Sequence, residues 1–116
     1  MAEAIGASPR LTVFGFSQGA QTVCRWVAAS NATVERIILW GGYPPHDLDL
    51  ERGIGRMKSA EVILVRGLED EFFSADVHSS QEARIREWGI PFETLTHTGS
   101  HELDPDLLLE IAERAG

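Results

Sequence analysis

A serine between two glycines occupies residues 15–19, which read Gly15-Phe16-Ser17-Gln18-Gly19 and follow an apolar run at residues 11–14. This pattern is typical of a turn from strand to helix so sharp that the serine backbone is strained and glycine is needed two residues before and after it. Such a turn exposes the serine hydroxyl and directs the backbone N–H of Gln18 toward whatever the serine attacks. The pattern therefore predicts a nucleophilic serine at Ser17.

Two further residues could activate that hydroxyl, because a serine alone is a weak nucleophile at neutral pH. His101 would accept the Ser17 proton during attack and return it to the leaving group. Asp70 would hold the imidazole in one tautomer and stabilise its protonated form. The chain order serine, aspartate, histidine is the order that α/β-hydrolases use.

Alternatives exist for both partners of the serine. Glu69, Glu71 and Asp76 lie near Asp70, and an acidic run after a strand is often only a solvated loop. His97 competes with His101, but it lies near the end of an expected strand, where it can be packed or hydrogen-bonded. His101 lies in the following loop, where a base belongs, and is favoured for that reason.

The elements that must position these residues alternate along the chain. Buried strands are expected over residues 11–16, 35–40, 61–66 and 92–96, helices over 18–29, 74–88 and 105–115, and irregular structure over 43–58. Asp104 is expected to cap the last helix, with Pro105 as its first residue. Strands that are apolar on both faces belong in a covered parallel sheet, whose carboxyl ends share one edge. The sequence thus predicts a single α/β domain over residues 1–116, with about four mainly parallel strands and three helices, and Ser17, Asp70 and His101 at that edge.

The bulk composition excludes several classes of function. The chain has 116 residues and a net charge of −8, which argues against nucleic acid or an anionic membrane surface as partner. It has no apolar stretch long enough to span a bilayer and no sign of a secretion signal at its first residues. A single cysteine, Cys24, excludes an internal disulfide and fits a reducing cytoplasm. No metal-ligand spacing is present, and neither a metal nor another cofactor is expected.

Four short segments resemble the C-terminal half of the phospholipase/carboxylesterase family, which is acyl-protein thioesterase-like. They are Gly15-Phe16-Ser17-Gln18-Gly19-Ala20, Trp40-Gly41-Gly42-Tyr43, Gly67-x-x-Asp70 and Ser100-His101-Glu102. That family consists of small α/β-hydrolases that cleave carboxylic esters and acyl thioesters. The resemblance implies Ser17, Asp70 and His101 as a catalytic triad and the Gln18 N–H as one oxyanion donor.

The sequence also departs from that family, because a full member is much longer. In that family, further strands precede the strand that corresponds to residues 11–16, and another loop supplies a second oxyanion donor. These strands, that loop and much of the acyl pocket have no counterpart here, so the fold is expected to be a truncated α/β-hydrolase. Residues 2–8 are expected to be the end of a helix leading into the first strand. That strand then becomes an edge without charge or proline, and we expect a second copy to pair with it as a homodimer.

Several other residues have both a structural and a functional interpretation. Trp40, Tyr43, Phe72 and Phe73 lie beside the expected active edge and can either pack in the core or line an acyl pocket. His46 and His78 are expected at the surface, Cys24 as a small buried hydrophobe, and Trp26 and Trp88 in the core.

The function expected from these features is hydrolysis of small carboxylic esters, with thioesters as a second class of substrate, by an acyl-enzyme mechanism in the cytoplasm. The alternative is a catalytically weak or inactive half-hydrolase that serves as an assembly or binding module or is simply a stable fragment.

Overall fold

A four-stranded parallel sheet forms the centre of the computed structural model, which describes residues 11–47 and 52–113. Its strands are β2 (Leu11–Phe16), β3 (Val34–Trp40), β4 (Glu61–Gly67) and β5 (Glu93–His97), hydrogen-bonded in that order. The helices are α1 (Gly19–Ala29), α2 (Arg52–Lys58), α3 (Ala75–Glu87) and α4 (Pro105–Glu113). The described residues therefore have the expected α/β architecture, with four helices instead of three.

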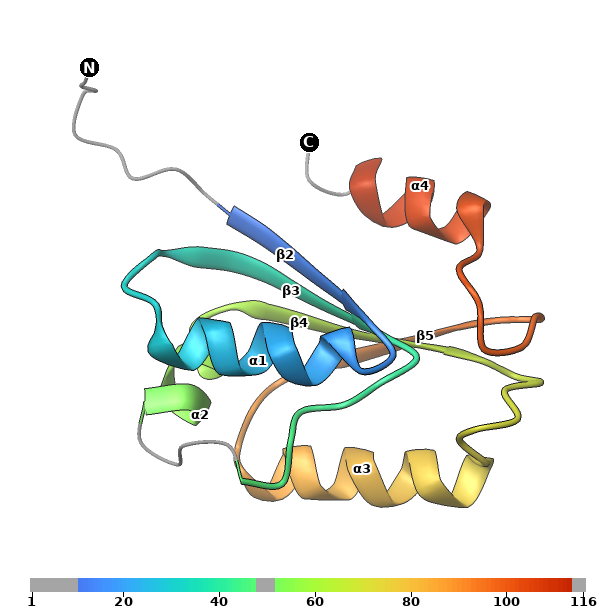
Figure 1. Cartoon of the computed structure of the whole chain (residues 1–116), viewed down its shortest axis with the longest axis horizontal. Helices are drawn as coiled ribbons and strands as arrows, with labels where there is room; N and C mark the ends of the chain where they lie inside the picture. The colour runs from blue at the N-terminus through green and yellow to red at the C-terminus, as the bar shows by residue number, and fades with distance from the viewer. Residues whose placement is uncertain (1–10, 48–51, 114–116) are drawn as a thin grey trace.

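The helices cover the two faces of the sheet unequally. Each neighbouring pair of strands is parallel, and α1, α2 and α3 each lie in one of the connections between them. Right-handed crossovers between consecutive parallel strands place their helices on one face. Figure 1 shows these three helices on that face and α4 by itself on the other.

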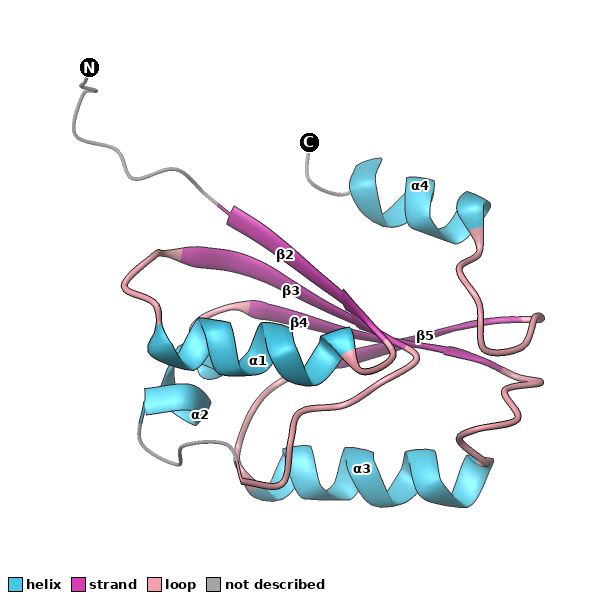
Figure 2. Ribbon diagram, in the orientation of Figure 1, coloured by secondary structure: helices cyan, strands magenta, loops and turns pink. Residues whose placement is uncertain are grey.

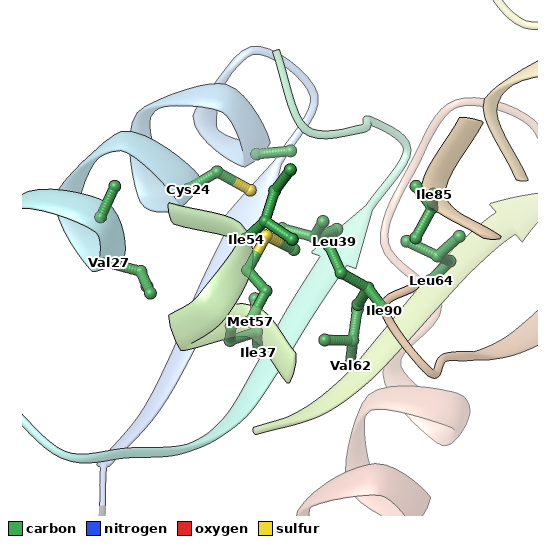
Figure 3. Close-up of a cluster of buried hydrophobic side chains, with 12 residues drawn as sticks. Cys24, Val27, Ile37, Leu39, Ile54, Met57, Val62, Leu64, Ile85 and Ile90 are labelled. Carbon is green, nitrogen blue, oxygen red and sulfur yellow. The ribbon is translucent and has the colours of Figure 1, made fainter. Parts of the chain in front are cut away.

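Two clusters of apolar side chains follow from the period-two alternation of the strands. Ile37 and Leu39 of β3 point to the face of α1, α2 and α3, where they join a buried cluster that includes Cys24 of α1 (Figure 3). Ile38 and Trp40 point to the opposite face, which Ile111 of α4 helps to bury. Cys24 is fully buried, as expected, and burial raises the pKa of its thiol to about 12.

Helix α2 lies in a stretch for which the sequence predicted irregular structure. Gly53 and Gly55 lower its intrinsic helix propensity, which is why the segment has little helical signal. Ile54 and Met57, three residues apart, are nevertheless buried in the cluster beneath α1. Burial of this face outweighs the weak propensity, because packing contributes most of the stability of short helices.

The other predicted strands and helices agree with the structure to within one residue at each described boundary. Asp104 Oδ1 accepts hydrogen bonds from the backbone N–H of Asp106 and Leu107, and α4 begins at Pro105 as predicted. Trp26 was expected in the core but is 46% exposed on α1. The predicted end of the last helix at residues 114–115 and the helix expected over residues 2–8 lie outside the described residues.

The loops that matter for chemistry follow the carboxyl ends of the strands. Figure 2 shows the connections after β2, β3, β4 and β5 gathered at the same end of the sheet. Parallel strands bring these loops together even though they are far apart in sequence. No helix in the described part of the chain is long and apolar enough to cross a membrane.

Candidate active site

Ser17 lies in a strained turn between β2 and α1. Its φ angle is 58°, and it is the one residue other than glycine with positive φ in the described ranges. A Cβ on Gly15 would lie 2.5 Å from the carbonyl oxygen of Gly19, so glycine is required there. The same requirement was expected at Gly19 but is absent, because a Cβ there would meet nothing within 4 Å. The clash therefore arises from one side of the turn only.

The sheet holds this turn in place from the neighbouring strand. The backbone N–H of Ser17 donates to the carbonyl oxygen of Trp40 at 2.8 Å, which extends the ladder between β2 and β3 by one residue. A Cβ on Gly42 would lie 2.3 Å from the Ser17 carbonyl oxygen, so the segment after β3 packs directly against the turn. The position of the Ser17 hydroxyl is thus fixed by rigid backbone on both sides.

Ser17, His101 and Asp70 are brought into one hydrogen-bonded chain. Ser17 Oγ lies 2.9 Å from His101 Nε2, and His101 Nδ1 lies 2.8 Å from Asp70 Oδ2. The side chain of Asp70 is 2% exposed and that of His101 is 11% exposed. An ionised Asp70 can only accept at this contact, so His101 Nδ1 carries a hydrogen and Nε2 is free to accept one from Ser17.

The Asp70 carboxylate is held by its own loop. Its Oδ1 accepts hydrogen bonds from the backbone N–H of Phe72 at 2.8 Å and of Phe73 at 3.1 Å. Burial opposes ionisation, but the hydrogen bonds from His101 and from these two N–H groups outweigh it and lower the pKa of Asp70 below its usual value. Asp70 is therefore ionised at neutral pH. Glu69 and Glu71, its alternatives, are exposed.

The loop that carries His101 is anchored by Trp40. The indole Nε1 of Trp40 donates to the carbonyl oxygen of Glu102 at 2.8 Å, and the Trp40 side chain is 1% exposed. The structure thus places Trp40 beneath the loop, in a packing role, and not at a substrate-binding surface, the other role considered for it. Its position is required by β3, whose other face at this point is occupied by Leu39.

Aromatic rings and a glycine surround the His101 imidazole. The ring centroid of Phe72 lies 4.7 Å from it and that of Phe16 lies 5.2 Å from it. Phe72 is 68% exposed, so it lies over the imidazole at the rim, as expected of a residue that could contact a substrate. Gly41 has a φ of 65°, and a Cβ there would lie 3.0 Å from His101 Cε1. The imidazole is therefore confined between a ring and bare backbone.

Tyr43 is buried at the base of the site and holds a second histidine. Its hydroxyl is hydrogen-bonded to His78 Nδ1. Burial raises the pKa of Tyr43 to about 12, so the hydroxyl stays protonated and donates to His78. His78 Nε2 lies 3.2 Å from Glu82 Oε2, and Thr94 donates to the same carboxylate oxygen at 2.5 Å.

His78 was expected at the surface but is 4% exposed. Tyr43 is distant in the sequence, so the sequence offered no pattern that pairs the two side chains. Burial lowers the pKa of His78, against the opposing effect of Glu82, which favours the neutral imidazole. His46 is exposed as expected, and His97 is buried, with Nδ1 accepting from the Gly99 N–H. His97 is thus a packed strand residue.

A small hollow of about 120 Å³ opens beside Ser17. Its lining residues come from the turn before α1, α1, the segment after β3, the loop before α3 and α3 itself. They are Ser17, Gln18, Gln21, Gly42, Tyr43, Pro44, His46, Phe73, Gln81 and Arg84. Sequence reasoning anticipated Gln18, Tyr43 and Phe73 but missed Gln21, Gln81 and Arg84. Gln21 could have been found, because it lies one helical turn after Gln18.

A larger hollow of about 500 Å³ lies elsewhere, along residues that include Asn31, Arg52 and Arg56. These residues lie near the end of α1, in α2 and in the loop before β3. They are at the amino ends of the strands, opposite the edge of the sheet that carries Ser17. Ligands in open α/β sheets bind beyond the carboxyl ends of the strands, so the smaller hollow is the better candidate. No cluster of three potential metal ligands occurs among the described residues.

Comparison with known proteins supports this arrangement at the level of fold. The structure is similar to the crystal structure of a candidate dienelactone hydrolase from Klebsiella pneumoniae, with a TM-score of 0.59 and 16% sequence identity. The chain has an α/β-hydrolase fold. The match covers 84% of this chain but only 42% of the Klebsiella protein, so the chain spans less than half of that neighbour's length. No protein-family model and no curated protein matches the sequence.

Proposed function

We propose that this α/β-hydrolase-fold chain is a serine hydrolase that cleaves carboxylic esters through an acyl-enzyme intermediate. The observation that carries the proposal is the continuous hydrogen-bonded chain from Ser17 Oγ through both nitrogens of His101 to Asp70. Each contact has the direction that activation of a serine requires. The strained φ of Ser17 adds support, since strain of this kind persists where surrounding structure enforces a functional geometry.

The reaction follows from the positions of the protons. Ser17 Oγ attacks the ester carbonyl carbon while His101 Nε2 accepts the Ser17 proton, and the carbonyl oxygen becomes an oxyanion. When the bond to the alcohol oxygen breaks, His101 returns that proton to the leaving alkoxide. Water then attacks the acyl carbon of Ser17, loses one proton to His101, and the acid is released as Ser17 Oγ takes the proton back. Ester and water are thereby converted to acid and alcohol.

The backbone N–H of Gln18 is the oxyanion donor in this mechanism. It lies at the start of α1, where the helix dipole is positive, and no backbone acceptor for it occurs among the described residues. Removing one oxyanion donor costs a factor of about a hundred to a thousand in other hydrolases. A site in which Gln18 acts alone would therefore turn over slowly.

The substrate class follows from the same chemistry. The resemblance to the phospholipase/carboxylesterase family implies small carboxylic esters as substrates, and thioesters as the next class. A lactone is a cyclic ester, so the name of the Klebsiella neighbour fits the same class of reaction. Phe72 and Tyr43 are the aromatic residues that we assign to substrate contact, Phe72 over His101 and Tyr43 in the hollow beside Ser17.

A fluorophosphonate probe tests the proposed function directly, because it reacts covalently only with an activated serine. We expect one equivalent of label on Ser17 in the unmodified chain and none in Ser17→Ala or His101→Ala. Ser79→Ala, which removes an exposed serine of α3, is the matched control and should label like the unmodified chain. Labelling at background level in the unmodified chain, shown by circular dichroism to be folded, would contradict the proposal and favour a binding module.

We also propose that β2, an edge strand among the described strands, pairs with the β2 strand of a second copy. β2 is an edge of the described sheet and contains no charged residue, whereas β5 at the other edge begins with Glu93. Apolar hollows of about 410 and 330 Å³ adjoin this edge on its two faces and share Phe14, which is 37% exposed. An uncharged edge with apolar surface on both sides favours strand addition.

Sedimentation velocity tests the pairing of β2. We expect the unmodified chain to sediment as a dimer and Thr12→Lys to shift it to monomer, because a lysine at an exposed edge position opposes strand pairing. Thr96→Lys places the same charge at an exposed position of the opposite edge strand β5 and should stay dimeric. A folded monomer at micromolar concentration in the unmodified chain would overturn this second proposal.

A further inference from the structure

Polar groups contribute nearly as much of the lining of the hollow beside Ser17 as apolar groups do, which is more than an acyl pocket for plain hydrocarbon chains would need. Three glutamines, Gln18, Gln21 and Gln81, border it together with Arg84. Ligand pockets are mostly apolar, and the few polar groups in them fix orientation and specificity. The polar lining therefore points to a polar group on the substrate.

Arg84 is the strongest of these polar groups because much of its guanidinium is enclosed. Its Nη2 donates to the Pro44 carbonyl oxygen at 2.5 Å and to the amide oxygen of Gln81. Its Nε and Nη1 are buried and have no hydrogen-bond partner. The guanidinium carbon lies 5.0 Å from the ring centroid of Trp88, which supports one face of the group.

No carboxylate neutralises Arg84 in the described part of the chain. Arg36, which is buried, shows the contrast, because its Nε lies 2.6 Å from Glu61 Oε1. Burial lowers the pKa of Arg84, and no acidic residue in the described ranges contributes a compensating charge to it. An enclosed cation without a counter-charge is unfavourable unless a ligand supplies that charge.

We propose that Arg84 binds a carboxylate on the substrate, so that Ser17 acts on half-esters of short dicarboxylic acids. This inference rests on the proposed function, since it names the substrate class of the same site. The substrate carboxylate would replace the neutral Gln81 amide oxygen as acceptor from Nη2 and add charge to the hydrogen bond. The hollow holds roughly four water-sized groups, which suits an acyl chain of that length with a terminal carboxylate.

Arg84 would also offset the repulsion between this acidic chain and an anionic substrate. The chain carries a net charge of −8, which repels anionic substrates at long range. A local cation at the pocket offsets this repulsion where the ester must be positioned. Neutral esters of the same length gain nothing from it, so the arginine provides discrimination as well as affinity.

The test compares two esters of equal chain length, 4-nitrophenyl butyrate and the 4-nitrophenyl half-ester of succinic acid. We expect Arg84→Met to lower the ratio of kcat/KM for the succinate ester to that for the butyrate ester by about tenfold or more. Arg86→Met removes the same charge from an exposed position of α3 and should leave the ratio unchanged. Gln81→Glu should lower the ratio as well, because it supplies a competing carboxylate without removing the arginine. It decides the question if Arg84→Met fails to fold.

Binding separates this inference from the proposed function. Titration calorimetry of succinate with the Ser17→Ala chain should show binding that is lost when Arg84→Met is added and kept when Arg86→Met is added. Equal ester ratios in Arg84→Met and Arg86→Met would overturn the carboxylate site while the hydrolase function stands. If neither ester is hydrolysed, succinate binding that depends on Arg84 still supports the site, and binding that is absent or independent of Arg84 overturns it.

Discussion

Ser17→Gly is expected to abolish ester hydrolysis and at the same time to be more stable than Ser17→Ala. Without the hydroxyl no acyl-enzyme can form, and kcat/KM for 4-nitrophenyl acetate should fall by about a thousandfold or more. The difference in stability arises because Ser17 has a φ of 58°, a conformation that costs a residue with a side chain of order 1–3 kcal/mol and costs glycine almost nothing.

The net gain should be smaller than the strain itself. Glycine has more freedom in the unfolded chain, which offsets about 0.5–1 kcal/mol of the strain that is released. Ser17→Gly also loses the Ser17–His101 hydrogen bond, as Ser17→Ala does, so we expect its free energy of unfolding to exceed that of Ser17→Ala by about 1 kcal/mol. For a domain of this size, that corresponds to a difference in Tm of roughly 4–8 °C between the two variants.

Ser17→Ala is the control that isolates the backbone contribution. Alanine also loses the hydrogen bond to His101 but keeps a Cβ at positive φ, so it should be as inactive as glycine and less stable. Thermal denaturation followed by circular dichroism measures the difference between the two variants. If Ser17→Gly melts at or below the temperature of Ser17→Ala, the turn stores no strain at this position.

The strands and their order along the chain could be predicted because each strand is indicated by the pattern of its own adjacent residues. The runs around Ile37 and Ile63 are apolar on both faces, which indicates a covered parallel sheet whatever lies elsewhere in the chain. The cap at Asp104 and the following proline are likewise readable from adjacent residues. Parallel strands then place the loops of Ser17, Asp70 and His101 at one edge, so the candidate site could also be proposed before any coordinates were known.

The failures share a different cause, because each depends on a contact between distant segments. Helix α2 forms because Ile54 and Met57 are buried under α1, which its two glycines do not indicate. His78 of α3 is buried where Tyr43, from the segment after β3, is hydrogen-bonded to it. Trp40 is diverted from the substrate to the carbonyl of Glu102. The role of Arg84 could not be predicted from neighbouring residues, because it depends on the lack of hydrogen-bond partners for its buried Nε and Nη1.

The loop of Asp70 makes the outcome of Asp70→Asn unusually specific. In the native site Oδ1 accepts from the N–H groups of Phe72 and Phe73, while Oδ2 faces His101 Nδ1. In the variant, the amide oxygen must keep the first position, because an NH₂ group there would meet two other donors. The NH₂ group is thereby directed at His101 Nδ1, which must give up its hydrogen. The hydrogen moves to Nε2, which can no longer accept from Ser17.

Asp70→Asn should therefore remain folded while kcat falls by about four orders of magnitude. The measurement is hydrolysis of 4-nitrophenyl acetate, with Glu69→Gln as the control that removes an exposed neighbouring carboxylate. Activity within tenfold of the unmodified chain would mean that Asp70 does not set the tautomer of His101.

The same variant changes how stability depends on pH, because the pKa of Asp70 is lower in the folded chain than its usual value of 3.8. Ionised Asp70 stabilises the fold fully above that value, and this contribution is lost as the pH falls through the lower folded pKa. Urea unfolding between about pH 5 and pH 2 should show a smaller loss of stability in Asp70→Asn than in the unmodified chain. Equal losses would mean that the three hydrogen bonds to Asp70 favour the neutral and the ionised acid alike, which the donation by Phe72, Phe73 and His101 argues against.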